Sequence, residues 1–259
     1  MLSLMAAWDP KTYLTFESER TRPAAELLAR VPVDHPHRVV DLGCGPGNST
    51  ALLAARWPNA LLEGLDNSAE MLEQAKTSGV RATWIRSDIA SWSPTQPRDV
   101  VYANAAFQWV GHHAALLPKL MSHVAPGGAL AFQVPRNFDE PSHTILRALA
   151  DEPRWREQLK SAREWHSVHA PAEYYAMLEP HAAHIDIWET EYLQVLDGED
   201  AVYRWTSGTG ARPFINALSG NDRENFITEY KRRLNEAYPM RKTGRTLFPF
   251  QRLFCVATK

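Results

Sequence analysis

Ten residues near the start of the chain, V-V-D-L-G-C-G-P-G-N at positions 39–48, restrict its fold more than any other segment. A β-branched run over 38–42 leads directly into three alternating glycines, and a helical pattern follows over 48–57. Glycine permits positive φ angles and lets the backbone approach a ligand closely. The segment therefore predicts a strand, a tight loop that contacts a ligand, and a helix, in that order.

The same alternation of strand and helix patterns continues through the first half of the chain. The predicted strands occupy residues 38–42, 61–66, 81–87, 99–103 and 129–134. Helical patterns lie between them, including one over 69–77 with Ser68 as its N-cap and one over 112–124 that ends at Pro126-Gly127-Gly128. Apolar strands separated by helices predict an α/β fold with a doubly wound, mostly parallel sheet. Such sheets bind ligands at the carboxyl ends of their strands.

The second half of the chain has a different pattern. Residues 140–180 are helical in pattern, 185–196 alternate like a half-exposed strand, and 221–238 form another helix. A closing strand over 246–258 is expected to break at Pro249. We therefore predict a seven-stranded sheet with a helical insertion before its last two strands.

Composition excludes several classes of function. The chain has 28 basic and 30 acidic residues, so it lacks the basic excess typical of nucleic-acid binding. No apolar stretch approaches the roughly 18 residues of a membrane span, and the N-terminus has no signal-peptide pattern, so we expect a cytoplasmic protein. Its two cysteines, Cys44 and Cys255, are expected to be buried thiols. The ten histidines lack the neighbouring cysteines or carboxylates of a zinc enzyme, so no metal is predicted.

The glycine loop has the spacing D-x-G-x-G-x-G. A dinucleotide loop would have G-x-G-x-x-G, with its third glycine where Asn48 stands. The observed spacing resembles motif I of the class I S-adenosylmethionine-dependent methyltransferases, and this resemblance implies S-adenosylmethionine as the cofactor. The cofactor-binding residues predicted in this way are Asp41, Gly43, Cys44, Gly45, Gly47, Asn48, Asp66, Asn67, Met71, Asp88, Ile89, Asn104 and Ala105, with Trp8 and Tyr13 from the N-terminal segment.

Three of these positions follow the ends of later strands. Asp66 ends the second strand, where a carboxylate can accept hydrogen bonds from two ribose hydroxyls, although it could also cap the next helix. By resemblance, Asp88 lies near the adenine amino group; an ordinary turn aspartate is the alternative. Asn104 ends the fourth strand, and the resemblance places its loop against the methionyl part of the cofactor.

A wider resemblance extends along the whole chain. The segments A-W-D-P-K-T-Y-L-T-F, N-F-D-E-P-S-H, G-T-G-A-R-P-F and F-P-F-Q-R-L-F lie outside the cofactor motifs. With them the chain resembles the trans-aconitate methyltransferases, which esterify a tricarboxylate. This resemblance implies a single methyltransferase domain over 1–259. Its expected parts are an N-terminal helical lid (1–30), a cofactor-binding core (31–135), a helical substrate-side cap (136–184 and 198–243) and two closing strands (185–197 and 246–258).

The chemistry of such a reaction is compatible with the sequence. A carboxyl group with a pKa near ~4 is ionised at pH 7, so it can attack the sulfonium methyl without a general base. A polycarboxylate substrate needs cations, and the planar guanidinium of arginine suits carboxylates. Arginine outnumbers lysine 21 to 7 in this chain, although codon bias can produce the same excess. The predicted substrate-binding residues are Arg20, Arg22, Arg136, Arg212, Gln108, Trp109, His143 and Tyr13.

Two other functions stay open at this point. A methyltransferase acting on a nitrogen or a phenolic oxygen would share the fold but need a catalytic base. A binding module that holds the cofactor or a nucleotide without transferring a methyl group would show ligand binding and no turnover.

Overall fold

The computed structural model describes residues 21–163 and 168–259. Its strands are β1 (Arg38–Leu42), β2 (Leu61–Asp66), β3 (Thr83–Arg86), β4 (Arg98–Asn104), β5 (Val124–Pro135), β6 (His184–Asp197) and β7 (Arg245–Thr258). Its helices are α2 (Thr21–Ala29), α3 (Asn48–Arg56), α4 (Ala69–Thr77), the short 3-10 helix η1 (Phe107–Trp109), α5 (His113–Ser122), α6 (Pro141–Ala150), α7 (Lys160–Arg163), α8 (Pro171–Leu178), α9 (Ala201–Ser207), α10 (Arg212–Ala217) and α11 (Gly220–Ala237).

The strands form one seven-stranded sheet in the order β3-β2-β1-β4-β5-β7-β6. The first five strands pair in parallel. Strand β7 runs antiparallel to β5, because Gly127 donates to Lys259 near one end while Arg136 donates to Gln251 near the other. Strand order reverses between β1 and β4, so the loops after these two strands flank the switch point at which doubly wound sheets bind ligands. The α/β class, the seven strands and the mostly parallel sheet are confirmed.

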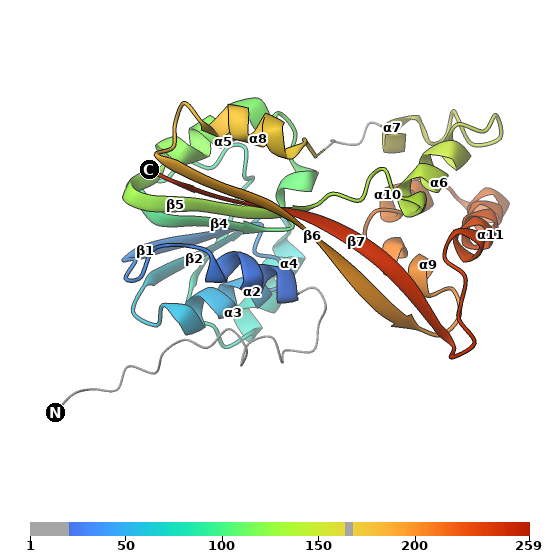
Figure 1. Ribbon diagram of the computed structural model, residues 1–259, viewed down its shortest axis with the longest axis horizontal. Helices are drawn as coiled ribbons and strands as arrows, with labels where there is room; N and C mark the ends of the chain where they lie inside the picture. The colour runs from blue at the N-terminus through green and yellow to red at the C-terminus, as the bar shows by residue number, and fades with distance from the viewer. Residues whose placement is uncertain (1–20, 164–167) are drawn as a thin grey trace. The chain divides into compact units, whose positions relative to one another are not determined.

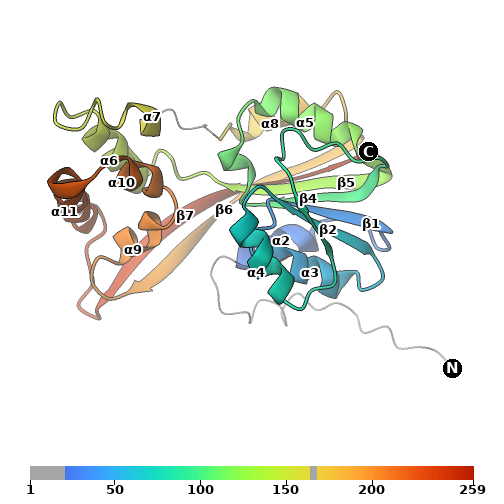
Figure 2. The ribbon, with the colours of Figure 1, turned by 180° about the vertical axis from the view of Figure 1, so that it is seen from behind.

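The chain divides into two compact units. Of the described residues, unit 1 comprises 21–134, 168–189 and 253–259, and unit 2 comprises 135–163 and 190–252. In unit 1, α5 and α8 lie together on one face of the sheet and α2 and α3 on the other, as Figures 1 and 2 show. Its core is built by the apolar inner strands, such as Val39, Val40 and Leu42 of β1, all fully buried. Both faces of a parallel strand are covered, so the strand is apolar along nearly its whole length.

Unit 2 has its own hydrophobic core. The side chains of Trp155, Phe226, Tyr230 and Phe248 pack there, and the first three come from two segments far apart in the sequence. The helical insertion before β6 is observed as α6, α7 and α8, and a second set of helices, α9 to α11, lies between β6 and β7. Helix α8, within the segment predicted to belong to the cap, is part of unit 1.

Two local expectations were wrong. Strand β7 is continuous through Pro249. Arg136, the residue after the end of β5, donates its backbone N–H to the carbonyl of Gln251. Residues two apart in a strand direct their backbone polar groups to the same edge, so the nitrogen of Pro249 faces the side on which β5 has already ended. No hydrogen bond of the sheet is therefore lost at the proline. Pro126-Gly127-Gly128 does not end the preceding helix, which stops at Ser122; it lies inside β5, where the ladder to β4 is irregular.

Candidate cofactor and substrate sites

The loop after β1 is held in shape by its glycines. Gly43, Gly45 and Gly47 all have positive φ angles, of 70°, 53° and 94°. A Cβ added at Gly43 would lie 2.5 Å from that of Ala106, so this position admits no side chain. A Cβ at Gly45 would meet none of the described residues within 4 Å, so the backbone here borders open space in this part of the structure.

Asp41 lies beneath this loop and is fully buried. Its Oδ2 accepts hydrogen bonds from the hydroxyls of Ser49 and Thr50, each at 2.7 Å, and so fixes the first turn of α3. Among the residues that the structure describes, its Oδ1 has no hydrogen-bond partner. Burial raises the pKa of the Asp41 carboxyl to about 6, although the two hydroxyl hydrogen bonds lower it. Asp41 therefore supports the glycine loop from inside the protein, and it does not line the cavity described below.

Asp66, at the end of β2, connects the glycine loop to helix α4. Its Oδ2 accepts from the backbone N–H of Gly45 at 2.9 Å, and its Oδ1 accepts from the N–H of Ser68 at 2.8 Å. Ser68 is the N-cap of α4, as predicted, and accepts from the N–H of Met71. Each carboxylate oxygen can accept a second hydrogen bond, so Asp66 keeps acceptor capacity for ligand hydroxyls.

The segment after β4 closes the other side of the switch point. Asn104 ends the strand, and its Oδ1 accepts from Nε2 of the buried Gln133 at 2.6 Å. This arrangement leaves the amide nitrogen of Asn104 as the donor available to a ligand. Ala105 adopts a φ of 52°, an uncommon value for a residue with a side chain.

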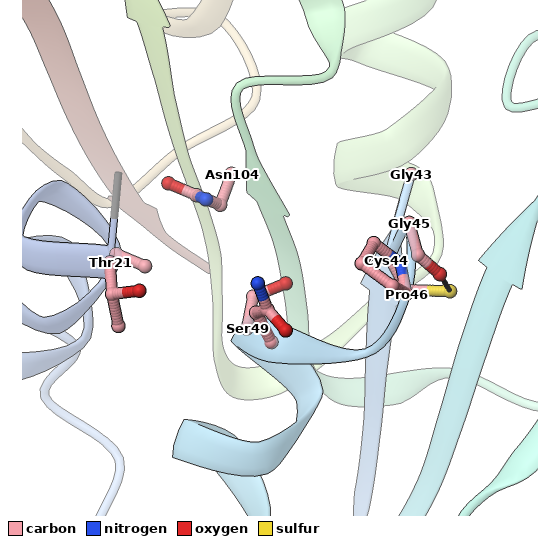
Figure 3. Close-up of a pocket in the computed structure, with 9 residues that line it drawn as sticks. Thr21, Gly43, Cys44, Gly45, Pro46, Ser49 and Asn104 are labelled. Carbon is pink, nitrogen blue, oxygen red and sulfur yellow. Dashed lines mark hydrogen bonds between the residues drawn. The ribbon is translucent and has the colours of Figure 1, made fainter. Parts of the chain in front are cut away.

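These segments enclose a cavity of about 180 Å³. Figure 3 shows it between the start of α2, the glycine loop and the end of β4. It is lined by Thr21, Ala24, Gly43, Cys44, Gly45, Pro46, Asn48, Ser49 and Asn104. Every lining residue belongs to unit 1. The thiol of Cys44 points to the sheet, since a Cβ on Gly64 would lie 3.2 Å from its Sγ, so Cys44 offers its backbone to the cavity.

The remaining predicted cofactor residues lie around the same strand ends. Ile89 is buried, and its Cδ1 lies 3.5 Å from where a Gly43 Cβ would be. Asp88 is exposed, and its carboxylate accepts from the N–H of Ala90. This is the contact of an ordinary turn aspartate, which is the alternative to a role in adenine binding. Asn67 is exposed and Met71 half-buried. Trp8 and Tyr13 lie outside the described residues.

The predicted substrate residues are distributed over both units. Arg136, His143 and Arg212 belong to unit 2. Gln108 and Trp109 follow β4 in unit 1, where Gln108 is buried and Trp109 is 50% exposed. Arg22 does not line the cavity: it is on α2, where its Nε contacts Glu26 at 2.7 Å. Arg20 and Tyr13 lie outside the described residues.

His143 and Gln108 have surroundings that restrict their chemistry. Burial lowers the pKa of His143 to about 4, so its imidazole is neutral at pH 7 and offers hydrogen bonds but no positive charge. Nε2 of Gln108 donates to the carbonyl of Ala105 at 2.7 Å, while its Oε1 is buried and has no hydrogen-bond partner in the described part of the chain. That free atom accepts hydrogen bonds, so it suits a ligand hydroxyl or amino group and not a carboxylate.

Sequence reasoning missed four residues that line the cavity, Thr21, Ala24, Pro46 and Ser49. Pro46 and Ser49 lie within or beside the glycine loop, so proximity to the motif was an available signal. Thr21 and Ala24 are brought in by the packing of α2 beside α3, which no local pattern indicates. Within residues 21–163 and 168–259, no cluster of three metal-ligating side chains occurs, and no helix is long and apolar enough to cross a membrane.

The groups at this end of the sheet are compatible with S-adenosylmethionine. The backbone at Gly45 borders the cavity, the amide nitrogen of Asn104 is a hydrogen-bond donor at its wall, and Asp66, beside the cavity lining, retains acceptor capacity. S-adenosylmethionine carries no pyrophosphate, so it does not need the N-terminus of a helix as an anion-binding site. Helix α3 begins at Asn48, and no side chain caps its first turn.

Comparison with known proteins places the fold. The YcgJ protein of Bacillus subtilis, at 13% identity, matches with a TM-score of 0.59 over 91% of this chain and 98% of its own. Phosphoethanolamine N-methyltransferase 2 of Haemonchus contortus, solved with S-adenosylhomocysteine, matches with a TM-score of 0.54 at 14% identity over 91% of this chain and 52% of its own. The methyltransferase-domain family matches residues 39–128. The fold is that of a class I methyltransferase, and the methyltransferase-domain match includes the glycine loop that lines the cavity.

Full-length relatives narrow the class to one family. Trans-aconitate 2-methyltransferase of Azoarcus sp. is 48% identical over 98% of this chain and 100% of its own. The enzymes of the same name from Rhodopseudomonas palustris and Streptomyces avermitilis are 46% and 47% identical, over 98% and 100% of this chain and 100% and 99% of their own. The chain belongs to the trans-aconitate 2-methyltransferase family.

Proposed function

We propose that this enzyme esterifies a carboxylate of trans-aconitate with the methyl group of S-adenosylmethionine. The observation that carries the proposal is the extent of the similarity. Identity of 46–48% covers nearly the whole chain, whereas the methyltransferase-domain family covers only residues 39–128. The substrate-side segments of unit 2 are therefore included in the likeness, and these are the parts in which methyltransferases of different specificity are expected to differ.

The proposed reaction is an in-line displacement. S-adenosylmethionine supplies a methyl group on a sulfonium; the O–CH3 bond forms as the S–CH3 bond breaks, leaving S-adenosylhomocysteine and a methyl ester. A carboxylate is already ionised at pH 7, so no proton has to be removed. The work of the protein is alignment, which can contribute up to roughly 7–11 kcal/mol.

Substrate recognition is proposed to depend on arginines that hold the carboxylates that do not react. Arg136, directly after β5, and Arg212, at the start of α10, are the first candidates. Arg22, whose Nε donates to Glu26, and Arg20, from the N-terminal segment, are further candidates. An arginine bound to the attacking oxygen would lower its nucleophilicity, so the reacting carboxylate is expected to be lightly bonded. Neutral His143 would then provide a hydrogen bond only.

We propose that different parts of the chain bind the cofactor and the substrate. Unit 1 binds the cofactor, and the segments 136–184 and 198–243 act mainly on the substrate side. The segment 1–30, with Trp8 and Tyr13, is proposed to cover the cofactor as a lid.

A methyl-transfer assay tests the proposal. Purified protein is incubated with methyl-labelled S-adenosylmethionine and, separately, with trans-aconitate, cis-aconitate, citrate, isocitrate and a mixture of phenols and amines. The expected result is base-labile label on trans-aconitate well above the other acids. Label on a phenol or amine would overturn the substrate and keep the methyltransferase class, and cofactor binding without any transfer would overturn the reaction itself.

A further inference from the structure

A buried histidine on α5 holds the segment that follows β4. His113 is 2% exposed; its Nε2 lies 2.9 Å from the carbonyl oxygen of Phe107, and its Nδ1 lies 2.9 Å from the hydroxyl of Tyr174. A carbonyl oxygen can only accept, so Nε2 carries the proton and Nδ1 accepts from the tyrosine. The imidazole is thus oriented from both sides.

Tyr174 reaches this position from α8 and is itself fully buried. Its ring stacks on that of His113, with centroids 5.7 Å apart and planes 27° apart. Its hydroxyl also accepts from the backbone N–H of His169 at 3.4 Å. The hydroxyl therefore has both an acceptor and a donor as neighbours, which fixes its direction and hence the protonation of the imidazole.

The segment that His113 holds reaches the cofactor cavity. It begins with Asn104, which lines the cavity, and continues with Ala105 at positive φ, whose N–H donates to the carbonyl of Gln133. Ala106 packs so closely under the glycine loop that a Cβ on Gly43 would lie 2.5 Å from its own. Phe107 is the next residue along the chain. A shift of its carbonyl would therefore also move Ala106, which packs against the glycine loop, and Asn104, which lines the cavity.

We propose that His113, oriented by Tyr174, is a positioning residue for the cofactor site. Its Nε2–H fixes the Phe107 carbonyl and thereby sets residues 104–107, which carry the Asn104 amide to the cavity. This role rests on the S-adenosylmethionine site described above and not on the identity of the methyl acceptor. Failure of methyl transfer to trans-aconitate would leave it untouched.

The test is a double-mutant cycle on cofactor affinity, measured as the Kd of S-adenosylhomocysteine by calorimetry. His113→Leu removes the hydrogen bond and is expected to weaken binding about five- to tenfold. His113→Gln places an amide N–H near the position of Nε2 and should stay within about twofold of wild type. In combination with Asn104→Ala, His113→Leu should add little, because both changes act through the same contact.

Two further variants keep the test decisive. Tyr174→Phe removes the hydroxyl that orients the imidazole through Nδ1 and should weaken binding in the same direction, so it decides the matter if His113→Leu does not fold. His123→Leu is the matched control, because His123 lies at the other end of α5, where its ring packs against Trp92. Wild-type affinity in His113→Leu or Tyr174→Phe, full additivity with Asn104→Ala, or equal weakening in His123→Leu would each overturn the proposal.

Discussion

At the scale of single residues, two glycines form a matched pair. Gly45 and Gly79 have φ angles of 53° and 76°, and a Cβ at either would meet nothing within 4 Å. Substitution by alanine therefore costs each a similar backbone strain of about 1 kcal/mol. Gly45 lines the cavity that is proposed to hold the cofactor, whereas Gly79 lies at the end of α4.

We expect Gly45→Ala and Gly79→Ala to lower the melting temperature by similar amounts, and only Gly45→Ala to weaken S-adenosylhomocysteine binding, by about tenfold or more. Calorimetry and thermal unfolding of both variants check this. Equal cofactor affinity in the two variants would show that the space at Gly45 is not part of the site.

Asp41 makes the stability of the protein depend on pH. Its pKa is raised by burial to about 6 in the folded protein, against 3.8 in an unfolded chain. The folded state therefore favours the protonated carboxyl, and the stability that this group contributes is present below pH 3.8 and is lost as the pH rises through 6.

We expect the free energy of unfolding of Asp41→Asn, relative to that of wild type, to rise by about 3 kcal/mol between pH 3.5 and 7. Asparagine keeps an oxygen that can accept from Ser49 and Thr50. Urea unfolding of both proteins across this range is the measurement. A difference that does not change with pH would mean that Asp41 has an ordinary pKa.

At the scale of elements, β2 and β4 are tied together across β1. Arg98 on β4 donates to both carboxylate oxygens of Glu63 on β2, at 2.7–2.9 Å, and the two side chains are only 9% and 24% exposed. Removing one partner of a buried pair leaves the other charge without compensation, which costs more than the pair itself contributes.

Glu63→Gln is therefore expected to lower the free energy of unfolding by about 2 kcal/mol or more, and the double variant with Arg98→Met to recover part of the loss. Glu73→Gln is the control, because it removes an exposed ion pair to Lys76 on α4 and should cost less than about 0.5 kcal/mol. Chemical denaturation of wild type, the single variants Glu63→Gln and Arg98→Met, the double variant and Glu73→Gln tests both expectations. A double variant as unstable as the sum of the single changes would argue against the coupling.

At the scale of the whole molecule, cofactor and substrate contacts are proposed to belong to different compact units. All residues that line the cavity are in unit 1, while Arg136 and Arg212 are in unit 2, which has its own core. A change at these arginines should therefore be visible in substrate kinetics and not in cofactor affinity.

Arg136→Ala and Arg212→Ala are each expected to raise the KM for trans-aconitate about tenfold to a hundredfold, as the loss of a charge-assisted contact implies, with the Kd of S-adenosylhomocysteine unchanged. Arg223→Ala, an exposed arginine on α11 of the same unit, should change neither. Steady-state kinetics with both substrates separates these outcomes. A KM that stays at the wild-type value in both variants would remove these arginines from substrate recognition.

The sequence by itself determined the fold class, and its resemblance to known methyltransferases indicated the cofactor and the family. The fold class depends on local signals: the apolar periodicity that defines β1 to β5, the glycine spacing after β1, and Ser68 as a helix cap. Each acts over a few residues and is read directly from the order of side chains.

Only the tertiary structure decided which residues share the cavity and what each one does there. Thr21 and Ala24 line it because α2 packs beside α3, and Asp41 turns inward because Ser49 and Thr50 offer their hydroxyls beneath the loop. The pairing of His113 with Tyr174 joins residues 61 positions apart. Such contacts depend on how distant elements pack, and no local pattern along the chain encodes them.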